Sequence, residues 1–212
     1  MLKINEIYAS IQGESSHTGL PCVFIRLTGC NLRCSWCDTA YAFHEGKDLT
    51  LEDIMHQVET FSLPLVEITG GEPLLQEDVY PLMNTLLDKG YRVMLETGGA
   101  LSIDKVPEKV IKILDIKCPG SGEEQKNHLE NLQLLAPHDE VKFVLLNHAD
   151  YEWSRDLLQK SNLAASVQVL FSPVYDKLEL KDLSKWILED RLPVRLQTQL
   201  HKVIWTKNAI GV

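Results

Sequence analysis

The sequence has few basic residues and no long apolar run, and each shortage excludes a class of function. Lys and Arg number 21 against 30 Asp and Glu, which gives a formal charge of -9 and a pI near 5.2. Binding to nucleic acid backbones depends mainly on Lys and Arg contacts, so we expect no nucleic acid partner. No stretch approaches the ~18 apolar residues of a membrane span, and residues 1–6 lack a basic and then apolar leader pattern. We therefore predict a cytoplasmic protein with a small-molecule substrate and no membrane contact.

The sequence also lacks internal repeats, linkers and low-complexity segments. Its 212 residues, 44% of them hydrophobic, are enough for one domain that buries most of its apolar surface. The five cysteines are an odd number, and three of them are clustered. This pattern does not suit a disulfide framework and favours a reducing compartment. The sequence thus predicts a single domain, residues 1–212.

Three of the cysteines, Cys30, Cys34 and Cys37, lie within eight residues at the spacing C-x3-C-x2-C. Three thiolates on one short loop, residues 28–39, can converge on an iron-sulfur cluster. In a four-iron, four-sulfur cluster, three protein ligands leave one iron open, and that iron can bind the amino and carboxylate groups of S-adenosylmethionine. We favour the cluster over a structural zinc site, which would need a fourth donor. The candidates for that donor are Cys22, Cys118, His17 and His44.

A second motif, Thr69-Gly70-Gly71-Glu72-Pro73, follows a short apolar strand predicted at 65–69. The two glycines permit close approach of the backbone to a ligand, and the Glu72 carboxylate can accept hydrogen bonds from an ammonium group. A tight turn before a helix would explain the same residues. The cysteine loop upstream favours the ligand-binding interpretation.

Arg26 is a single charge within the apolar strand predicted at 23–27. Its side chain either faces solvent or grips a carboxylate, for which the planar guanidinium fork is well suited. The preceding loop contains Gln12, Glu14 and His17, polar residues that need no role beyond solvation. On position alone, the two interpretations of Arg26 are equally supported.

Strands alternate with helices along the rest of the chain, a pattern typical of parallel strands joined by right-handed crossovers. Helices are predicted at 50–60, 77–89, 129–135, 151–160 and 178–189, and strands at 4–11, 23–27, 65–69, 92–96, 110–116, 141–146, 167–171 and 194–197. About six parallel strands are too few for a closed barrel of eight. The predicted fold is α/β, an incomplete (partial TIM-like) βα barrel, with a flexible loop at 119–124 as a candidate lid.

In such barrels the functional residues lie at the carboxyl ends of the strands. The chemically useful side chains of this sequence fall at those positions, which are residues 69–72, 96–98, 115–117 and Ser172. We therefore expect the site at that edge of the sheet.

The cysteine loop and the Gly-Gly-Glu motif resemble those of the radical S-adenosylmethionine superfamily. Other segments are similar to one family within it, the 7-carboxy-7-deazaguanine synthases of deazapurine and queuosine biosynthesis. These segments are Ile11-Gln12-Gly13-Glu14, Arg26, Cys37-Asp38-Thr39 and a C-terminus bearing Gln, His and Lys. The chain departs from the family at Ser15, often Gly there, and at 197–202, where Gln-Thr-Gln-Leu-His-Lys and a longer tail replace Gln-Thr-His-Lys. The resemblance extends from about residue 5 to the end of the chain.

The resemblance implies a role for each of these residues. The [4Fe-4S] cluster would be bound by Cys30, Cys34 and Cys37. S-adenosylmethionine would be bound by Trp36, Cys37, Asp38, Gly71, Glu72, Glu96, Asp115, Lys117 and Ser172. Mg2+, near the substrate carboxylate, would be bound by Thr39. The substrate would be bound by Ile11, Gln12, Gly13, Glu14, Arg26, Thr69, His201 and Val212.

The reaction implied by the resemblance converts 6-carboxy-5,6,7,8-tetrahydropterin into 7-carboxy-7-deazaguanine with loss of ammonia and regenerates S-adenosylmethionine. An external one-electron donor of the flavodoxin or ferredoxin type would start it, and the resulting 5′-deoxyadenosyl radical would take a hydrogen from C6. The task of the protein is then positioning and exclusion of water. The resemblance also implies a homodimer. A glycyl-radical-enzyme activase, which acts on a protein partner, is the alternative enzyme, but it does not explain residues 11–14 or the His-Lys tail.

Overall fold

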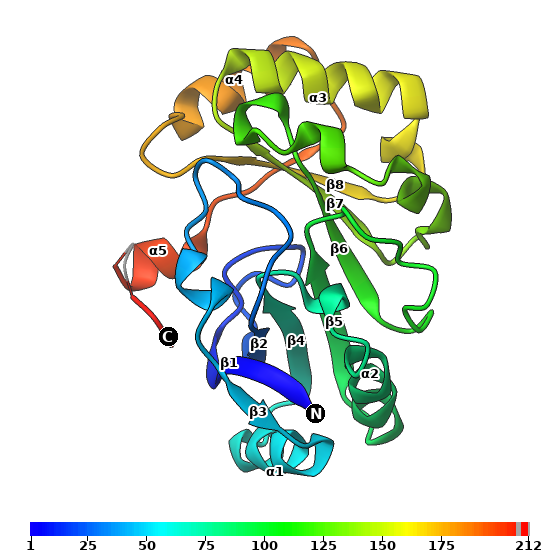
Figure 1. Cartoon of the computed structure of the whole chain (residues 1–212). Coiled ribbons are helices and arrows are strands. Elements are labelled where there is room, and N and C mark those ends of the chain that lie inside the picture. Colours follow the sequence, from blue (N-terminus) through cyan, green and yellow to red (C-terminus); the bar gives the residue numbers. More distant parts are fainter. Residues whose placement is uncertain (207–208, 212) are drawn as a thin grey trace.

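The computed structural model describes residues 1–206 and 209–211, and nine strands of this part form one sheet. The strands are β1 (Leu2–Ile11), β2 (Pro21–Leu27), β3 (Lys47–Leu49), β4 (Leu65–Gly70), β5 (Arg92–Thr97), β6 (Ile111–Ile116), β7 (Glu140–Leu145), β8 (Gln168–Pro173) and β9 (Arg195–Leu196). Their order is β3-β1-β2-β4-β5-β6-β7-β8-β9 (Figure 1).

All neighbouring pairs from β2 to β9 are parallel, whereas β1 pairs antiparallel with both β2 and β3. The edge strands β3 and β9 lie at opposite ends of the order, so the sheet stays open. An incomplete βα barrel is thus confirmed. The parallel set has seven strands in the described residues, against the six or so expected, and its last member is the two-residue β9, within the strand predicted at 194–197.

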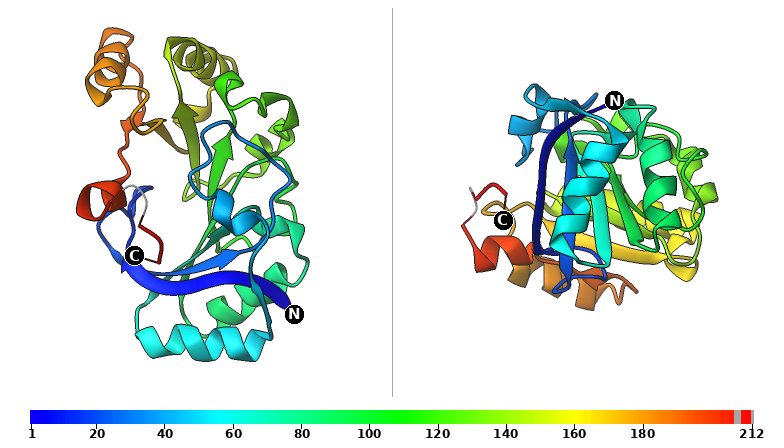
Figure 2. Two further views of the ribbon diagram at one scale, coloured as in Figure 1. Left: turned by 60° about the vertical axis from the view of Figure 1, so that its left-hand side comes forward. Right: turned by 90° about the horizontal axis from the view of Figure 1, so that it is seen from below.

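Five α-helices of the described residues accompany the sheet, and four of them cover its outer side (Figures 1 and 2). They are α1 (Leu51–Phe61), α2 (Val79–Asp88), α3 (His148–Ser161) and α4 (Leu180–Glu189). The start of α1 follows from local chemistry, since the Thr50 hydroxyl accepts from the Asp53 backbone N–H and the Asp53 carboxylate accepts from the Thr50 N–H. The fifth helix, α5 (Leu200–Ile204), lies apart from the others beside the loop that follows β1 (Figure 2).

Alternation along the strands divides the buried residues into an outer and an inner set. Val23, Ile25 and Leu27 of β2 belong to the large apolar core that the helices cover. Cys22 and Phe24, at the alternate positions, belong to a small second core inside the curved sheet. Residues of the inner parity near the carboxyl ends of the strands are mostly polar or charged, and there the site is built.

Two segments differ from their prediction. Residues 119–124 are not a free lid but form a tight 3-10 turn, Pro119–Ser121, and the Glu123 carboxylate that follows it accepts from the Arg33 N–H of the cysteine loop at 2.7 Å. Residues 129–134 form a 3-10 helix and not an α-helix. In addition, the short β3 had not been predicted. No helix within the described residues is long and apolar enough to cross a membrane.

Candidate active site

The cysteine loop, residues 28–39, is fixed to the carboxyl edge of the sheet by backbone hydrogen bonds. The Glu72 N–H of the turn after β4 donates to the Gly29 carbonyl at 2.8 Å, and the Ser35 N–H donates to the Ser121 carbonyl at 3.0 Å. Segments far apart in the sequence therefore hold the loop from two sides. The loop geometry does not depend on its own residues alone.

The three cysteines of the loop are unpaired thiols, with Cys30 and Cys34 half-buried and Cys37 exposed. Burial raises the pKa of each thiol, and the Lys117 ammonium nearby opposes that rise in all three. A negative charge on Cys37 would also raise the pKa of the other two thiols. Three soft sulfur donors on one loop, with a cation nearby, are the ligands that an anionic iron-sulfur cluster takes.

The donors that a zinc site would need lie elsewhere. Cys22 is buried in the small inner core, and Cys118 is buried with its sulfur 3.3 Å from the Ser154 hydroxyl oxygen. Neither of these cysteines is therefore placed to complete a zinc site on the cysteine loop.

Gly71 lies where the turn after β4 touches the cysteine loop. A Cβ atom at this position would come within 2.1 Å of the Gly29 carbonyl oxygen and 2.9 Å of the Cys30 Cβ. Only glycine fits so close a backbone approach. The second glycine of the motif thus joins the two segments that the sequence had singled out separately.

The Glu72 carboxylate is fully buried and already has protein donors. It accepts from the Leu74 N–H at 3.0 Å, the Gly98 N–H at 2.7 Å and the Thr97 hydroxyl at 2.9 Å. Burial raises the pKa of Glu72, and these hydrogen bonds oppose that rise. Glu72 therefore ties the end of β4 to the end of β5, and its expected contact with the ammonium of S-adenosylmethionine stays a prediction.

Gln12 and Glu14 follow β1 and approach the inside of the sheet. The buried Gln12 side chain donates to the Glu67 carboxylate of β4 and accepts from the Glu14 N–H at 3.0 Å. The Glu14 carboxylate accepts from the Gln199 amide at 2.8 Å and the Gln197 amide at 3.2 Å. The Gln12 side chain thus fixes the loop after β1 to β4. The Glu14 side chain of that loop points toward the inside of the sheet.

A group of charged side chains fills the inner side of the sheet near its carboxyl edge. We call it the interior charge cluster, and it consists of Glu14, Glu67, Glu96, Asp115, Lys117 and Lys142. The Lys142 ammonium lies at its centre, 2.9 Å from Glu14 and 3.5 Å from Asp115, and it also bonds Glu96. Lys117 pairs with Asp115 at 3.0 Å. The structure therefore brings together Glu14, Glu96, Asp115 and Lys117, which the sequence had predicted from separate segments.

Mutual electrostatics set the protonation of this cluster. Burial alone would raise the pKa of Glu14, but the attraction and hydrogen bond of Lys142 outweigh it and lower that pKa. The pKa of Glu67 is raised well above its ordinary value, first by burial and then by the charges of Glu96 and Glu14. The carboxylates around Lys142 compensate its burial and raise its pKa as well. The cluster thus contains a charged lysine, a charged Glu14 and a Glu67 that favours its neutral form.

Lys142 was missed by the sequence reasoning, although a signal for it exists. It is a single charge in the otherwise apolar strand predicted at 141–146, as Arg26 is in the strand at 23–27. The same rule applied to Glu67 in the strand at 65–69 would have found a third member of the inner face. Each charge occupies an inward position of a parallel strand.

Arg26 lies on the inner side of β2 and is held by β1. Its Nε donates to the Glu6 carboxylate at 2.7 Å and its Nη2 to the Tyr8 hydroxyl at 2.9 Å, while the Tyr41 hydroxyl donates to the same Glu6 at 2.8 Å. Arg26 pairs in register with Thr69, whose hydroxyl donates to Glu96 at 3.2 Å. A guanidinium has five N–H donors, so these contacts aim the Arg26 side chain and leave others for a ligand.

The C-terminal segment closes over the loop that follows β1. The Leu200 N–H donates to the Gly13 carbonyl at 2.9 Å, and the His201 ring packs where a Cβ on Gly13 would lie, 2.1 Å from Nδ1. The Lys202 ammonium pairs with Asp38 at 2.6 Å. The segment thus joins the loop after β1 to the exit of the cysteine loop. Of the predicted residues here, Val212 lies outside the described residues.

The remaining predicted residues surround these groups. The Thr39 hydroxyl donates to Asp38 at 3.0 Å, and Lys202 together with this hydrogen bond outweighs burial and lowers the pKa of Asp38. Ser172 is buried at the end of β8, whereas Trp36 and Ile11 are half-buried. Thr39 thus adjoins a charged carboxylate, the kind of oxygen donor that Mg2+ prefers, and its expected metal contact stays a prediction.

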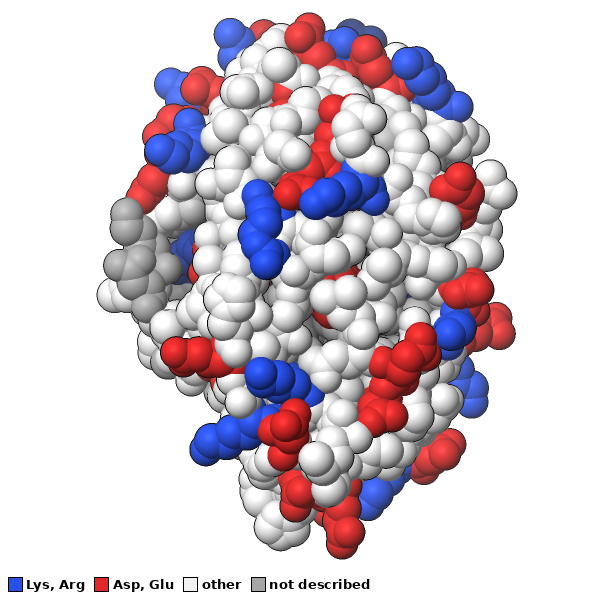
Figure 3. All heavy atoms as spheres, viewed as in Figure 1, with Lys and Arg blue, Asp and Glu red and all other residues white. Residues whose placement is uncertain are grey.

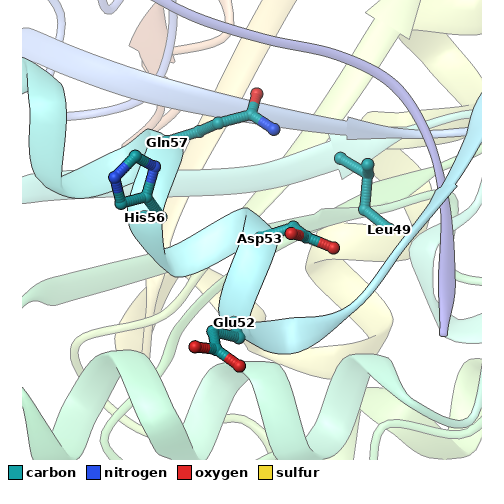
Figure 4. Close-up of a pocket in the computed structure, with 5 residues that line it drawn as sticks. All are labelled: Leu49, Glu52, Asp53, His56 and Gln57. Atoms are coloured by element: carbon teal, nitrogen blue, oxygen red, sulfur yellow. The ribbon is translucent and has the colours of Figure 1, made fainter.

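A hollow of about 410 Å3 on the outside of the molecule takes no part in this site. It is lined by Leu49, Glu52, Asp53, His56 and Gln57 of β3 and α1 (Figure 4). The surface seen in Figure 3 carries acidic and basic groups intermixed. The site is therefore identified by the inner face and the carboxyl edge of the sheet, not by the hollow at α1.

The open parallel barrel, with three unpaired thiols at its carboxyl edge, defines a radical S-adenosylmethionine enzyme. The model of the Radical SAM superfamily matches residues 24–119, from β2 to the turn after β6. The fold is similar to the crystal structure of QueE from Escherichia coli, with a TM-score of 0.77 and 24% identity over 94% of each chain. It is also similar to Streptococcus suis SuiB bound to precursor peptide SuiA, with a TM-score of 0.60 and 14% identity over 84% of this chain and 48% of that one.

Sequence similarity is closer and covers whole chains. The sequence is 47% identical to the 7-carboxy-7-deazaguanine synthase of Koribacter versatilis over 100% of both chains. It is 45% identical to the 7-carboxy-7-deazaguanine synthase of Chlorobaculum tepidum over 100% of this chain and 97% of the relative. The chain therefore belongs to the 7-carboxy-7-deazaguanine synthase family.

Membership of this family decides among the functions that the sequence left open. The chain is a radical S-adenosylmethionine enzyme whose cofactors are a [4Fe-4S] cluster and S-adenosylmethionine, with a small-molecule substrate and a reductant as its partners. The alternatives of a zinc-binding module and of a glycyl-radical-enzyme activase are overturned by the full-length matches to one synthase family.

Proposed function

We propose that this protein is a carbon-nitrogen lyase that converts 6-carboxy-5,6,7,8-tetrahydropterin into 7-carboxy-7-deazaguanine with loss of ammonia. One observation carries the proposal beyond the names of the relatives. The C-terminal segment binds both the loop after β1, through Gly13 and Glu14, and the exit of the cysteine loop, through Asp38. The side chains expected to recognise the pterin are thereby held beside those expected to hold the cofactors.

When bound, the cluster and S-adenosylmethionine supply the radical that removes hydrogen from the substrate. Cys30, Cys34 and Cys37 would hold the cluster, and the turn at Gly71 would hold S-adenosylmethionine against it. Glu96 and Asp115, at the ends of neighbouring strands, are carboxylates that can accept hydrogen bonds from hydroxyl groups of the cofactor. The chain itself binds, orients and shields the reactants from water.

The polar groups of the site match the two ends of the substrate. The Glu14 carboxylate, kept charged by Lys142, can accept from the guanidine-like N–H groups of the pterin edge. Arg26, aimed by Glu6 and Tyr8, can bind the substrate carboxylate with its remaining donors. Mg2+ held partly by Thr39 would bind near the same carboxylate.

The remaining parts of the proposal concern the setting of the enzyme. A flavodoxin or ferredoxin type of donor would supply the electron, and the chain would act as a homodimer of single-domain subunits. A cytoplasmic location is favoured because all five cysteines are free thiols, which a reducing compartment preserves.

Turnover and the role of Arg26 can be tested in one experiment. Anaerobically reconstituted protein with reductant, S-adenosylmethionine and the carboxypterin should produce the deazapurine chromophore. Arg26→Ala should raise the KM for the pterin by roughly 10- to 100-fold, the worth of a charge-assisted contact, without losing the cluster or S-adenosylmethionine cleavage. Arg155→Ala, which removes an arginine from the outer helix α3, is the matched control and should leave the KM unchanged.

Two results would count against these assignments. Wild-type protein with a complete cluster that cleaves S-adenosylmethionine but forms no deazapurine would refute the proposed reaction. A normal KM in Arg26→Ala would refute the carboxylate contact alone.

A further inference from the structure

Lys142 lies where the binding sites for the two reactants meet. It is in the middle of β7, in register with Asp115 of β6 on one side and Leu170 of β8 on the other. Its side chain is only 6% exposed, and the ammonium contacts Glu14, Glu96 and Asp115. None of the roles assigned from the sequence or from the relatives involves this residue.

The three carboxylates around Lys142 come from segments with different tasks. Glu14 belongs to the loop after β1, which in the proposed function recognises the pterin. Glu96 and Asp115 end β5 and β6, where S-adenosylmethionine is expected. A single ammonium therefore bonds one side chain of the pterin site and two of the cofactor site.

The other lysine and the arginine on the inner side of the sheet have partners of their own. Lys117 pairs with Asp115 and lies toward the thiols of the cysteine loop, and Arg26 is held by Glu6. Without the Lys142 charge, Glu14 and Glu96 would each lose the ammonium that pairs with them. Removing one partner of a buried ion pair leaves the other with an uncompensated charge. The Glu14 carboxylate would then take up a proton, or the loop that carries it would move away.

We propose that Lys142 is a positioning residue that fixes the pterin-recognition loop against the S-adenosylmethionine site, so that the radical is formed only next to the C–H bond it must attack. The inference rests on the proposed function for its reactants. Its physical basis is the shared ammonium, because hydrogen bonds to Glu14 and Glu96 and an ion pair with Asp115 link the loop to the ends of β5 and β6. A small displacement of the substrate is costly in a reaction that depends on positioning.

The chain offers a matched control in Lys112. This lysine is on the adjacent strand β6, is also buried, and pairs with Asp139 at 3.0 Å. It lies near the start of the strand, whereas Asp115 lies near its carboxyl end, and the odd spacing of the two places them on opposite sides of the sheet. Lys112→Met also removes a buried lysine from an ion pair, but one that has no contact with the site.

The first test compares Lys142→Met with Lys112→Met in reconstituted holoenzyme. Because S-adenosylmethionine is regenerated in the proposed reaction, free 5′-deoxyadenosine accumulates only when the radical misses the substrate. We expect Lys142→Met to raise 5′-deoxyadenosine per deazapurine by about 10-fold or more, the scale of coupling between contacting sites, and Lys112→Met to leave this ratio unchanged. An equal ratio in both variants would overturn the proposal, whereas wild-type protein that makes no deazapurine would refute the proposed function.

The second test does not need the loaded enzyme. Hydrogen exchange of residues 12–20 in cluster-free protein should accelerate about 10-fold in Lys142→Met and stay at the wild-type rate in Lys112→Met. If Lys142→Met fails to fold, Glu14→Gln removes the negative charge of this ion pair from the loop side and leaves Lys142 paired with Glu96 and Asp115. The proposal then expects faster exchange in residues 12–20 but not at the ends of β5 and β6. Unchanged exchange in that loop would overturn it.

Discussion

Single charged residues inside apolar strands mark the functional side of this sheet. Arg26, Glu67 and Lys142 each interrupt an apolar strand, and each faces inward and forms hydrogen bonds to the loop after β1 or to β1 itself. Burying such groups is costly unless partners compensate their charge. Their presence in strands therefore indicates function more strongly than a charge in a loop does.

Glu67 gives a prediction for pH at this scale. Because its folded-state pKa is raised far above the ordinary value of 4.5, the folded protein holds a proton that the unfolded chain has lost. Its contribution to stability is complete below that ordinary value and is lost as pH rises toward the folded-state pKa. The Glu67→Gln side chain can still accept from Gln12 and has no such proton, so its free energy of unfolding should decline less with rising pH.

The measurement is denaturant unfolding of both proteins. As pH rises above the ordinary value of 4.5, we expect Glu67→Gln to lose less stability than wild type. Glu77→Gln, at an exposed glutamate, is the control and should follow wild type. Parallel pH profiles for Glu67→Gln and wild type would show that Glu67 is ionised in the folded state.

Among the helices, the short α5 contacts two segments of the site, the loop after β1 and the exit of the cysteine loop. It has five residues, and none of them is buried, so its position depends on side-chain and backbone contacts to other segments. The packing against Gly13 is tight, because the His201 ring fills the space that the side chain of any other residue would need. The helix is thus placed by the loop that it covers.

Gly13→Ala tests this placement. The backbone of Gly13 does not need glycine for its conformation, so the new methyl group acts by displacing His201. We expect pterin affinity to fall about 10-fold or more, with cluster content and S-adenosylmethionine cleavage retained. Titration with the carboxypterin measures it.

A second substitution separates this displacement from general damage. Adding His201→Ala to Gly13→Ala removes the ring that the new methyl group displaces, leaves only the 3.0 Å approach to the backbone nitrogen of residue 201, and should bring pterin affinity back toward the level of His201→Ala alone. A Gly13→Ala protein with wild-type affinity would mean that α5 does not control the pterin site.

At the scale of the whole molecule, the expected cofactor site and the hydrophobic core lie in different parts of the fold. The main core lies between the sheet and the outer helices, whereas the cysteine loop is held by backbone bonds at the edge. Removing the cluster should therefore leave far-UV circular dichroism unchanged and lower Tm by roughly 2–4 °C for each kcal/mol by which the free energy of unfolding falls. Cys34→Ala should behave like the cluster-free protein. A loss of secondary structure in either would mean that the cluster is part of the folding core.

Prediction from sequence was most successful where a pattern is local. The capped start of α1 at Thr50, the turn at Gly70 and Gly71, and the spacing of Cys30, Cys34 and Cys37 each depend on neighbours within a few residues. The prediction of a lid at residues 119–124 was wrong because it used only the local composition, which includes two glycines. The hydrogen bond from the Arg33 N–H to the Glu123 carboxylate joins residues far apart in the sequence.

The sequence by itself determined the alternation of strands and helices, the thiol set and the family resemblance, because these are written in short-range order. Only the tertiary structure decided that Lys142 pairs with Glu14, which is 128 residues away in the sequence. It also decided that Glu6 and Tyr8 orient the Arg26 side chain by hydrogen bonds. The reason is the parallel sheet, which sets side by side inward positions that lie far apart in the chain. Strand pairing and the burial of charge, and not local pattern, select those partners.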